Sequence, residues 1–265
     1  MNTLPILRKP DFKVNGAFEE VAREKRMCDV HGKYESVRTR LLGRLTEWTS
    51  CEQCEREAAD AEERMKQERK YQARLRNAGI PQRFVGKGFA QFRATTSAQE
   101  KVLLAMKSYA DNFAQHRARG QCLTIVGQPG TGKTHLALAV GQQLLQSSFR
   151  ARYTTVFDAI QAIRETWRND SVESEADVIR RLAGVDLLIL DEVGVQRGTE
   201  SEQLELFKIL GARYDRMLPT IVISNVPVDD LKHYLGERAW DRLRENGGKL
   251  LVFDWGSARG SNDCD

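Results

Sequence analysis

CLTIVGQPGTGKT, residues 122–134, is the stretch that decides the fold of this 265-residue chain. Its first five residues form an apolar run of the kind found in buried strands, and Leu136, Val140 and Leu144 then recur at helical spacing. The octet that begins at Gly127 fits the pattern GxxxxGK followed by Thr or Ser, which is typical of a phosphate-binding loop. Such loops connect a strand to a helix, so the sequence predicts a nucleotide-binding α/β domain.

The positions of this loop match the chemistry of a triphosphate. Gly130 and Gly132 allow backbone conformations that direct successive N–H groups inward, and the following helix adds the positive end of its dipole. Lys133 is expected to reach the β- and γ-phosphates, and the Thr134 hydroxyl is expected to ligate Mg²⁺. The alternative, a glycine-rich turn with an incidental lysine, is disfavoured by the flanking strand and helix. The residues expected to bind ATP with Mg²⁺ are Gly127, Gln128, Pro129, Gly130, Thr131, Gly132, Lys133, Thr134, His135 and Asp191.

A second apolar run ends in two acidic residues. Residues 187–190 are LLIL, and Asp191 and Glu192 follow directly. Ligand sites of parallel sheets lie at the carboxyl ends of the strands, so both carboxylates are expected near the phosphates. We expect Asp191 to hold Mg²⁺, directly or through water, and Glu192 to polarise the attacking water as a catalytic base. An acidic pair in a turn is the alternative, and the preceding phosphate-binding loop favours catalysis.

Three further residues are candidates for the same chemistry. Asn225 follows the apolar run TIVIS at residues 220–224 and could reach the attacking water or the γ-phosphate, although an Asn before Pro227 is also a common turn residue. Arg242 and Arg259 lie in the late segments GERAWDR and WGSAR. An arginine from the same chain or a neighbour can neutralise charge on a transferring phosphoryl group. Composition alone does not distinguish either arginine from a surface residue.

Apolar runs along the rest of the chain predict the remaining strands. They alternate with amphipathic helical patterns, which indicates an α/β fold with a doubly wound parallel sheet and helices on both faces. The strands are expected at residues 152–157, 185–190, 220–224 and 250–255. The charge-rich stretch before Gly79 and Pro81 consists of good helix formers and predicts an exposed helix, either partner-facing or simply solvated. The expected organisation is a small partner-binding module at 1–54, a helical linker at 55–80, an ATPase domain at 81–260 and a disordered tail at 261–265.

The module at 1–54 contains two pairs of metal-ligand residues. Two residues separate Cys28 from His31, and two residues separate Cys51 from Cys54. Together the pairs form a Cys₃His set of the kind that closed structural zinc sites use. Bound Zn²⁺ would also explain how a segment with little apolar content folds. The alternative is a set of free thiols in a flexible arm.

One aromatic residue is a candidate for contact with DNA. Trp167 follows a helical stretch and precedes a polar, acidic loop, with Arg168 beside it. A partly exposed Trp next to a cation could stack on a base of single-stranded DNA, whereas core packing is the competing use of such a side chain.

Composition indicates a soluble globular protein. The formal net charge is +4, with 29% charged and 41% hydrophobic residues, which permits contact with nucleic acid without requiring it. No apolar run reaches the length of about 18 residues that a membrane span needs. The first thirty residues also lack the apolar stretch of a signal peptide. We therefore expect a cytoplasmic protein that does not contact membranes.

Several segments together resemble the DnaC/IstB branch of the AAA+ ATPases over residues 70–260. The matching segments are RNAGIP from Arg76, GQPGTGKTHLA from Gly127, DLLILDEVGVQ from Asp186, TIVISN from Thr220, GERAWDRL from Gly236 and FDWGSAR from Phe253. The resemblance implies that Asn225 is a sensor residue, that Arg242 acts as a finger on the ATP of a neighbouring subunit, and that Arg259 is the second sensor. It also places Trp167 and Arg168 in the element that contacts DNA.

This resemblance implies a function and a set of partners. Members of the branch form ATP-dependent homo-oligomers, open spirals or rings, around single-stranded DNA, and their amino-terminal domains bind a hexameric DnaB-type replicative helicase. The implied activity is therefore that of a helicase loader, in which ATP binding and hydrolysis switch assembly and release. The Cys/His module resembles that of phage or prophage DnaC-like proteins, and any helical lid after the last strand must be minimal.

Two other functions stay open at this point. An IstB-like transposition helper would share the ATPase core but act on duplex DNA and a transposase. A zinc-bearing DNA-binding regulator would bind ATP without turnover. Glu192 and Arg242 argue against the regulator, because a module that only binds ATP needs neither residue.

Overall fold

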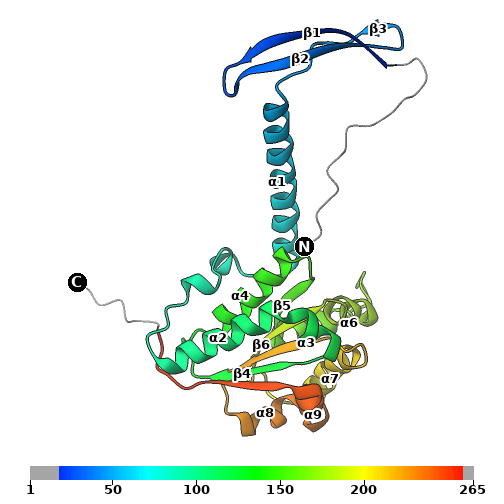
Figure 1. Cartoon of the computed structure of the whole chain (residues 1–265). Helices are drawn as coiled ribbons and strands as arrows, with labels where there is room; N and C mark the ends of the chain where they lie inside the picture. The colour runs from blue at the N-terminus through cyan, green and yellow to red at the C-terminus, as the bar shows by residue number, and fades with distance from the viewer. Residues whose placement is uncertain (1–17, 259–265) are drawn as a thin grey trace. The chain divides into compact units, whose positions relative to one another are not determined.

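A five-stranded parallel sheet lies at the centre of the larger of two units into which the chain divides (Figure 1). The computed structural model describes residues 18–258. The units comprise Met1–Arg69 and Lys70–Asp265, and the boundary falls within helix α1 (Glu52–Asn77). Over the described range, no helix combines the length and the apolar character that crossing a bilayer requires.

The strands of this sheet follow the order β5-β6-β7-β4-β8, and every neighbouring pair is parallel. Parallel strands need crossover connections and are buried on both faces, which explains the continuous Val, Ile and Leu runs in the sequence. Because β7 lies between β4 and β6, the carboxyl ends of these three strands are neighbours. The strands are β4 (Leu123–Gly127), β5 (Ala151–Thr155), β6 (Leu187–Val193), β7 (Thr220–Ser224) and β8 (Lys249–Phe253).

Helices cover both faces of the sheet (Figure 1). One apolar cluster joins α2, α3 and α4 to the face that carries Leu123, Ile189 and Ile221. A second cluster joins α5 to α9 to the opposite face, which carries Leu188 and Val222. This is the doubly wound α/β architecture that the sequence predicts. The helices are α2 (Ser97–Asp111), α3 (Phe113–Arg119), α4 (Lys133–Gln146), α5 (Val156–Glu165), α6 (Glu175–Ala183), α7 (Glu200–Tyr214), α8 (Val228–Leu235) and α9 (Glu237–Arg244), with short 3₁₀ helices η1 (Gln82–Phe84), η2 (Phe89–Gln91) and η3 (Glu245–Gly247).

Two strands end earlier than the sequence predicts. One is β8, which ends at Phe253 rather than at residue 255, and the other is β5. The apolar run favours a strand through Phe157, whereas β5 ends at Thr155 and α5 begins at Val156. The Thr155 hydroxyl accepts a hydrogen bond from the Asp158 backbone N–H at 3.0 Å and caps the helix there. This cap overrides the strand preference of Val156 and Phe157.

One charged side chain is enclosed in the core of the larger unit. Arg213, on α7, is 1% exposed. Its guanidinium donates hydrogen bonds to the carbonyls of Leu182 and Val185 at 3.2 and 2.9 Å. It also donates to the Thr220 hydroxyl at 2.9 Å. Arg213 therefore ties the segment before β6 to the first residue of β7, and the hydrogen bonds compensate for its burial.

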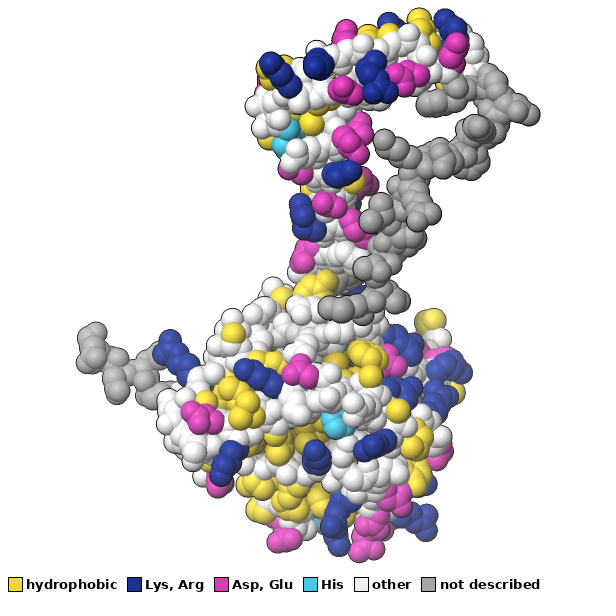
Figure 2. Space-filling model, viewed as in Figure 1, with side chains coloured by type: hydrophobic (Ala, Val, Ile, Leu, Met, Phe, Trp, Pro, Cys, Tyr) yellow, Lys and Arg dark blue, Asp and Glu magenta, His cyan; other side chains and the backbone are white. Residues whose placement is uncertain are grey.

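The smaller unit contains an antiparallel sheet and the first part of α1. The strands are β1 (Phe18–Cys28), β2 (Gly32–Leu41) and β3 (Arg44–Leu45), in that order. Among residues 19–69, only Ser36 and Cys51 are buried. Along α1, acidic and basic side chains alternate on the exposed surface (Figure 2). A three-stranded sheet that buries so little is marginally stable by itself, so this unit needs another source of stability.

Candidate nucleotide site and candidate metal centre

The phosphate-binding loop connects β4 to α4, and two of its glycines fill positions where no larger residue fits. Gly127 has a φ of 151°, and a Cβ there would lie 2.3 Å from the Phe253 carbonyl oxygen. Gly132 has a φ of 94°, and a Cβ there would lie 2.6 Å from the ring of Phe92. The loop is therefore closely flanked by the end of β8 and by the residue after η2.

The Lys133 ammonium lies inside this loop. Lys133 is 5% exposed, and its Nζ donates hydrogen bonds to the carbonyls of Gly127 at 2.7 Å and Gln128 at 2.8 Å. The Thr131 hydroxyl donates to the same Gln128 carbonyl at 2.8 Å. Trp255 follows β8, and its Nε1 donates to the Thr131 carbonyl at 3.0 Å. The shape of the loop is thus fixed by its own side chains and by the end of the sheet, with a buried cation at its centre.

Asp191, near the end of β6, lies against the start of α4. Its Oδ2 accepts hydrogen bonds from the hydroxyls of Thr134 at 2.8 Å and Tyr153 at 3.1 Å, and its Oδ1 accepts one from the Glu192 backbone N–H at 2.7 Å. Asp191 is 4% exposed. Mg²⁺ prefers hard oxygen ligands such as hydroxyl and carboxylate oxygens, so Thr134 and Asp191 fit a Mg²⁺ ion. Bound with ATP, this ion would neutralise charge on the β- and γ-phosphates.

A cavity of about 390 Å³ opens over the loop, and three of its lining residues are not sequence candidates. Arg83 and Phe84 belong to η1, and their only sequence signal is the RNAGIP segment directly before them. Tyr153 lies on β5, where partial burial and the charge of Asp191 raise the pKa of its phenol, so that its hydroxyl remains a donor. The lining comprises Arg83, Phe84, Pro129, Gly130, Gly132, Lys133, Thr134, His135, Tyr153, Asp191, Glu192 and Asn225.

Glu192 and Asn225 both contribute to this cavity from strand ends. The register of β6 against β7 shifts between Leu190 and Val193, and Glu192 has a left-handed backbone with a φ of 62°. This conformation is costly for residues other than Gly, and such strain is concentrated at functional sites. It leaves the Glu192 side chain exposed next to the buried Asp191. Asn225, directly after β7, is also exposed.

His135 connects the loop to the segment that contains η1 and η2. Its Nε2 and the Gly88 carbonyl lie 2.9 Å apart, at hydrogen-bond distance. The imidazole ring packs near the rings of Phe84 and Phe92, with centroids 6.5 and 6.0 Å away. Two turns further along α4, Gln142 accepts a hydrogen bond from the Gly86 backbone N–H at 2.8 Å. These contacts fix one wall of the cavity against the nucleotide-binding helix.

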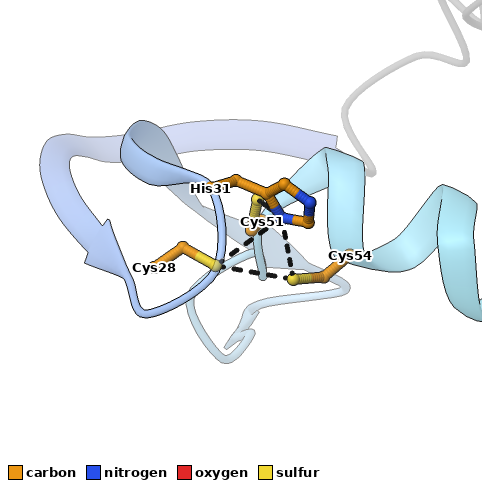
Figure 3. A group of neighbouring side chains, drawn as sticks. All are labelled: Cys28, His31, Cys51 and Cys54. Atoms are coloured by element: carbon orange, nitrogen blue, oxygen red, sulfur yellow. Dashed lines mark hydrogen bonds between the residues drawn. The ribbon is translucent and has the colours of Figure 1, made fainter.

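The four predicted zinc ligands lie together in the smaller unit, with their ligand atoms turned toward one another (Figure 3). Cys28 and His31 lie at the turn between β1 and β2, Cys51 precedes α1, and Cys54 is in the first turn of α1. All four ligand atoms lie within 4.8 Å of one another. The distance from Cys54 Sγ is 3.5 Å to Cys28 Sγ and 3.3 Å to His31 Nδ1. Ligand atoms around a tetrahedral zinc ion are separated by roughly 3.5 to 3.8 Å, so the set fits Zn²⁺.

The surroundings of these ligands favour their metal-binding forms. His31 Nε2 lies 3.1 Å from a Glu57 carboxylate oxygen, a contact that orients Nδ1 toward the sulfur atoms. Hydrogen bonds from the backbone N–H groups of His31 and Val30 lower the pKa of Cys28 to about 6, which favours the thiolate that a metal requires. Cys122 is buried in the other unit and does not belong to this cluster.

The sequence matches the family described as IstB-like ATP binding protein over residues 42–242. The chain belongs to this IstB-like family. It is 33% identical over 190 residues to the replicative helicase loader DnaC of Buchnera aphidicola subsp. Baizongia pistaciae. The aligned region covers 72% of this chain and 76% of that protein. It is 31% identical over 197 residues to the replicative helicase loader DnaC of Escherichia coli strain K12. This aligned region covers 74% of this chain and 79% of that protein.

Solved structures confirm the AAA+ fold of this IstB-like chain. The crystal structure of the DnaC helicase loader matches with a TM-score of 0.58 at 24% identity, over 65% of this chain and 99% of that one. AMPPCP-bound DnaA from Aquifex aeolicus matches with a TM-score of 0.52 at 25% identity, over 63% of this chain and 49% of that one. The predicted resemblance to the DnaC/IstB branch is therefore confirmed.

Arg242, one of the two candidate arginines of this IstB-like protein, is not among the described residues that line the cavity. Arg242 lies on α9, where its Cζ is 4.7 Å from the ring centroid of Phe207. Arg259 lies outside the described residues. The residue before it, Ala258, donates a backbone hydrogen bond to the Gly130 carbonyl at 3.0 Å, so the chain approaches the loop just before Arg259.

Trp167 and Arg168 follow α5 on the surface. Trp167 is 55% exposed, and its Nε1 donates a hydrogen bond to the Glu175 carboxylate at 3.2 Å. Arg168 forms an ion pair with Asp170 at 3.1 Å. The exposure of Trp167 excludes core packing. A groove of about 640 Å³ lies beside α5 and carries apolar, cationic and acidic side chains. Its lining comprises Phe157, Ile160, Gln161, Arg164, Glu165, Arg168, Val195, Gln196, Arg197, Thr199 and Glu202.

Proposed function

We propose that this protein is an ATP-hydrolysing helicase loader that binds a hexameric DnaB-type replicative helicase and single-stranded DNA in the cytoplasm. ATP binding and hydrolysis would switch it between assembly and release, because a nucleotide shifts a conformational equilibrium when it binds the two states unequally. One observation carries the proposal: a single cavity brings together the phosphate-binding loop, the Thr134–Asp191 pair and the exposed Glu192. The similarity to relatives named replicative helicase loader DnaC supports a role of this ATPase site in DNA replication.

The motif residues of the cavity have proposed roles in hydrolysis. The loop N–H groups and the Lys133 ammonium bind the phosphates, and the burial of Lys133 strengthens its electrostatic effect. Thr134 and Asp191 hold Mg²⁺. Glu192 orients the attacking water and accepts its proton, and Asn225 positions the same water from the neighbouring strand end.

The two arginines are proposed to complete the site. Arg242 stacks away from the cavity of its own chain, so the proposed finger acts on the ATP of a neighbouring subunit in a homo-oligomer, an open spiral or a ring. Arg259 would act as the second sensor. ATPase activity per subunit is then expected to rise cooperatively with protein concentration, and Arg242→Ala should remove that rise while nucleotide affinity persists.

The smaller unit is the proposed docking element for the helicase. Leu41, Leu42 and Leu45, at the turn between β2 and β3, are 44%, 81% and 50% exposed. Leu42 has a left-handed backbone with a φ of 49°, a conformation that two-residue hairpin turns usually give to Asn or Gly. Leu42 therefore contributes little to the stability of its own unit, because its side chain is exposed and its backbone conformation is unfavourable for a leucine. An exposed apolar side chain of this kind supports a role in contact with a partner protein.

The groove beside α5 is the proposed DNA-binding surface. Arg164, Arg168 and Arg197 can attract the phosphate backbone. Trp167 and Phe157, 55% and 64% exposed, offer ring faces on which bases can stack. Cations and aromatic faces on one surface are the combination that single-strand binding uses.

Co-purification with a DnaB-type hexamer, with and without ATP, tests the proposed function. We expect the wild-type chain to retain the hexamer and Leu42→Asp to lose it. Leu104→Asp is the control, because Leu104 is 65% exposed on α2 in the other unit. Retention by Leu42→Asp would exclude the hairpin turn as the docking element.

The family match favours a second candidate function, an IstB-like transposition helper that acts on duplex DNA and a transposase. It shares the same ATPase cavity, so ATP hydrolysis does not separate it from a loader. The same co-purification does: a chain that ignores the helicase but retains a transposase on duplex DNA would be a helper.

A further inference from the structure

We infer that Tyr153 is a positioning residue that holds the Asp191 carboxylate in its Mg²⁺-binding orientation. The inference rests on the proposed ATPase function and adds a residue that no loop or strand motif marks. Tyr153 lies on β5, which pairs with β6 in a register that sets Thr155 opposite Asp191. Its side chain therefore approaches the carboxylate from a neighbouring strand, on the edge side of the sheet.

The carboxylate of Asp191 is held by donors from three different elements. The Thr134 hydroxyl, on α4, and the Tyr153 hydroxyl, on β5, donate to Oδ2 at 2.8 and 3.1 Å. The backbone N–H of Glu192 donates to Oδ1 at 2.7 Å. Because Asp191 is 4% exposed, protein donors rather than bulk solvent determine its orientation.

The backbone of Tyr153 is itself fixed. Its N–H donates to the Ala78 carbonyl at 2.7 Å. Gly79 approaches so closely that a Cβ there would lie 2.7 Å from the Tyr153 carbonyl oxygen. The ring packs against the apolar cluster under α4. The phenol is thus a rigid donor beside a carboxylate that could otherwise rotate.

This arrangement predicts which property the hydroxyl controls. Thr134 would serve two purposes in the proposed site, because its hydroxyl donates to Asp191 and its oxygen would be a ligand of Mg²⁺. Tyr153 has only the second purpose, so it fixes the carboxylate without occupying an ion position. Removing its hydroxyl should weaken the binding of Mg²⁺ with nucleotide and leave the affinity for nucleotide alone unchanged.

Fluorescence titration of the full-length protein with a methylanthraniloyl-ATP analogue tests the inference. The Mg²⁺ concentration for half-maximal binding is measured at fixed nucleotide, and nucleotide affinity is measured separately in EDTA. For Tyr153→Phe we expect the half-saturating Mg²⁺ concentration to rise roughly tenfold, the size of a lost hydrogen bond to a charged group. Affinity in EDTA should stay within about twofold of wild type, a change well below one hydrogen bond.

Two further variants separate the hydroxyl from the ring. Tyr153→Leu removes both and should show the same Mg²⁺ shift as Tyr153→Phe. Tyr109→Phe is the matched control, because the buried Tyr109 hydroxyl donates to the Gln121 carbonyl at 2.9 Å outside the cavity. It should keep the wild-type Mg²⁺ requirement.

The possible outcomes distinguish this inference from the function on which it rests. An unchanged Mg²⁺ requirement in Tyr153→Phe would overturn the inference, and so would an equal loss of affinity in EDTA, which indicates a packing role. A wild-type chain that binds no Mg²⁺-nucleotide would instead overturn the proposed ATPase function itself.

Discussion

The two units of this protein are stabilised in different ways. The larger unit buries two apolar clusters, one on each face of its parallel sheet. The smaller unit buries only Ser36 and Cys51 among residues 19–69, and it brings four metal-ligand side chains together. The comparison leads us to propose that apolar burial stabilises the nucleotide site, whereas bound zinc would stabilise the proposed docking element. Changes made in one unit should therefore leave the other intact.

The largest expected effect is the loss of the smaller unit when zinc is removed. Zinc binding by small Cys/His modules is worth about 10 to 16 kcal/mol at neutral pH, which is comparable to the whole stability of an ordinary domain. We expect Cys51→Ser, or a strong chelator, to abolish amide-exchange protection of β1 and β2 while the strands of the larger sheet stay protected. The wild-type protein should contain one zinc per chain, measured by plasma mass spectrometry.

Cys122→Ala is the control for this experiment. Cys122 is a buried thiol of the larger unit, outside the cluster of metal ligands. The variant should therefore keep its zinc and the amide-exchange protection of the hairpin formed by β1 and β2. A metal-free wild-type protein whose hairpin is fully protected would break the comparison between the two units.

The next effect concerns the nucleotide site. Glu192→Gln should lower the rate of ATP hydrolysis by about 10² to 10⁴-fold, because the variant lacks the general base. Nucleotide affinity and zinc content should not change, since Glu192 is an exposed residue at the rim of the cavity. Steady-state phosphate release measures the rate. Glu100→Gln, an exposed glutamate on α2, should hydrolyse ATP like wild type, and equal rates in both variants would exclude Glu192 as the base.

A core substitution should destabilise the larger unit alone. Arg213→Ala removes donors to Leu182, Val185 and Thr220 and leaves buried acceptors without partners. We expect the free energy of unfolding of this unit to fall by about 3 to 5 kcal/mol, measured by urea denaturation. Zinc content should stay at the wild-type value. A loss below about 1 kcal/mol would show that water or neighbouring groups replace the guanidinium. It would contradict the conclusion that the hydrogen bonds of Arg213 stabilise this core.

Sequence patterns predicted the larger unit well because its strands are continuous apolar runs and its loop is a dense motif. The doubly wound α/β architecture and the pairing of a loop with an acidic strand end both follow from such local patterns, whereas the resemblance to the DnaC/IstB branch implies the AAA+ family. Tyr153 was missed because its role depends on which strand lies beside β6, and no local pattern encodes that adjacency. Arg83 and Phe84 were missed for a similar reason, since η1 reaches the cavity only through tertiary contacts with α4.

The smaller unit was harder to predict beyond its metal ligands. The spacing of Cys28, His31, Cys51 and Cys54 marks the cluster that the structure brings together. The hairpin of β1 and β2 carries no such signal, because the one buried residue at 19–41 is polar, Ser36, so the alternation of apolar and polar residues that marks a half-buried strand is missing. The sequence also does not decide whether Trp167 is buried or exposed, because an isolated aromatic residue is compatible with either environment.

The smallest expected effect tests that exposed aromatic residue. Trp167→Ala should weaken binding to single-stranded DNA by about 1 to 3 kcal/mol, the value of one base stacked on an aromatic ring. Fluorescence anisotropy with a labelled oligothymidine measures the affinity, and Trp167→Phe should retain most of it. Val172→Ala is the control, because Val172 is fully exposed in the following loop without a ring. Since Trp167 is 55% exposed, its replacement should not alter the stability of the larger unit, and a loss of stability without a loss of DNA affinity would assign the side chain to the fold instead.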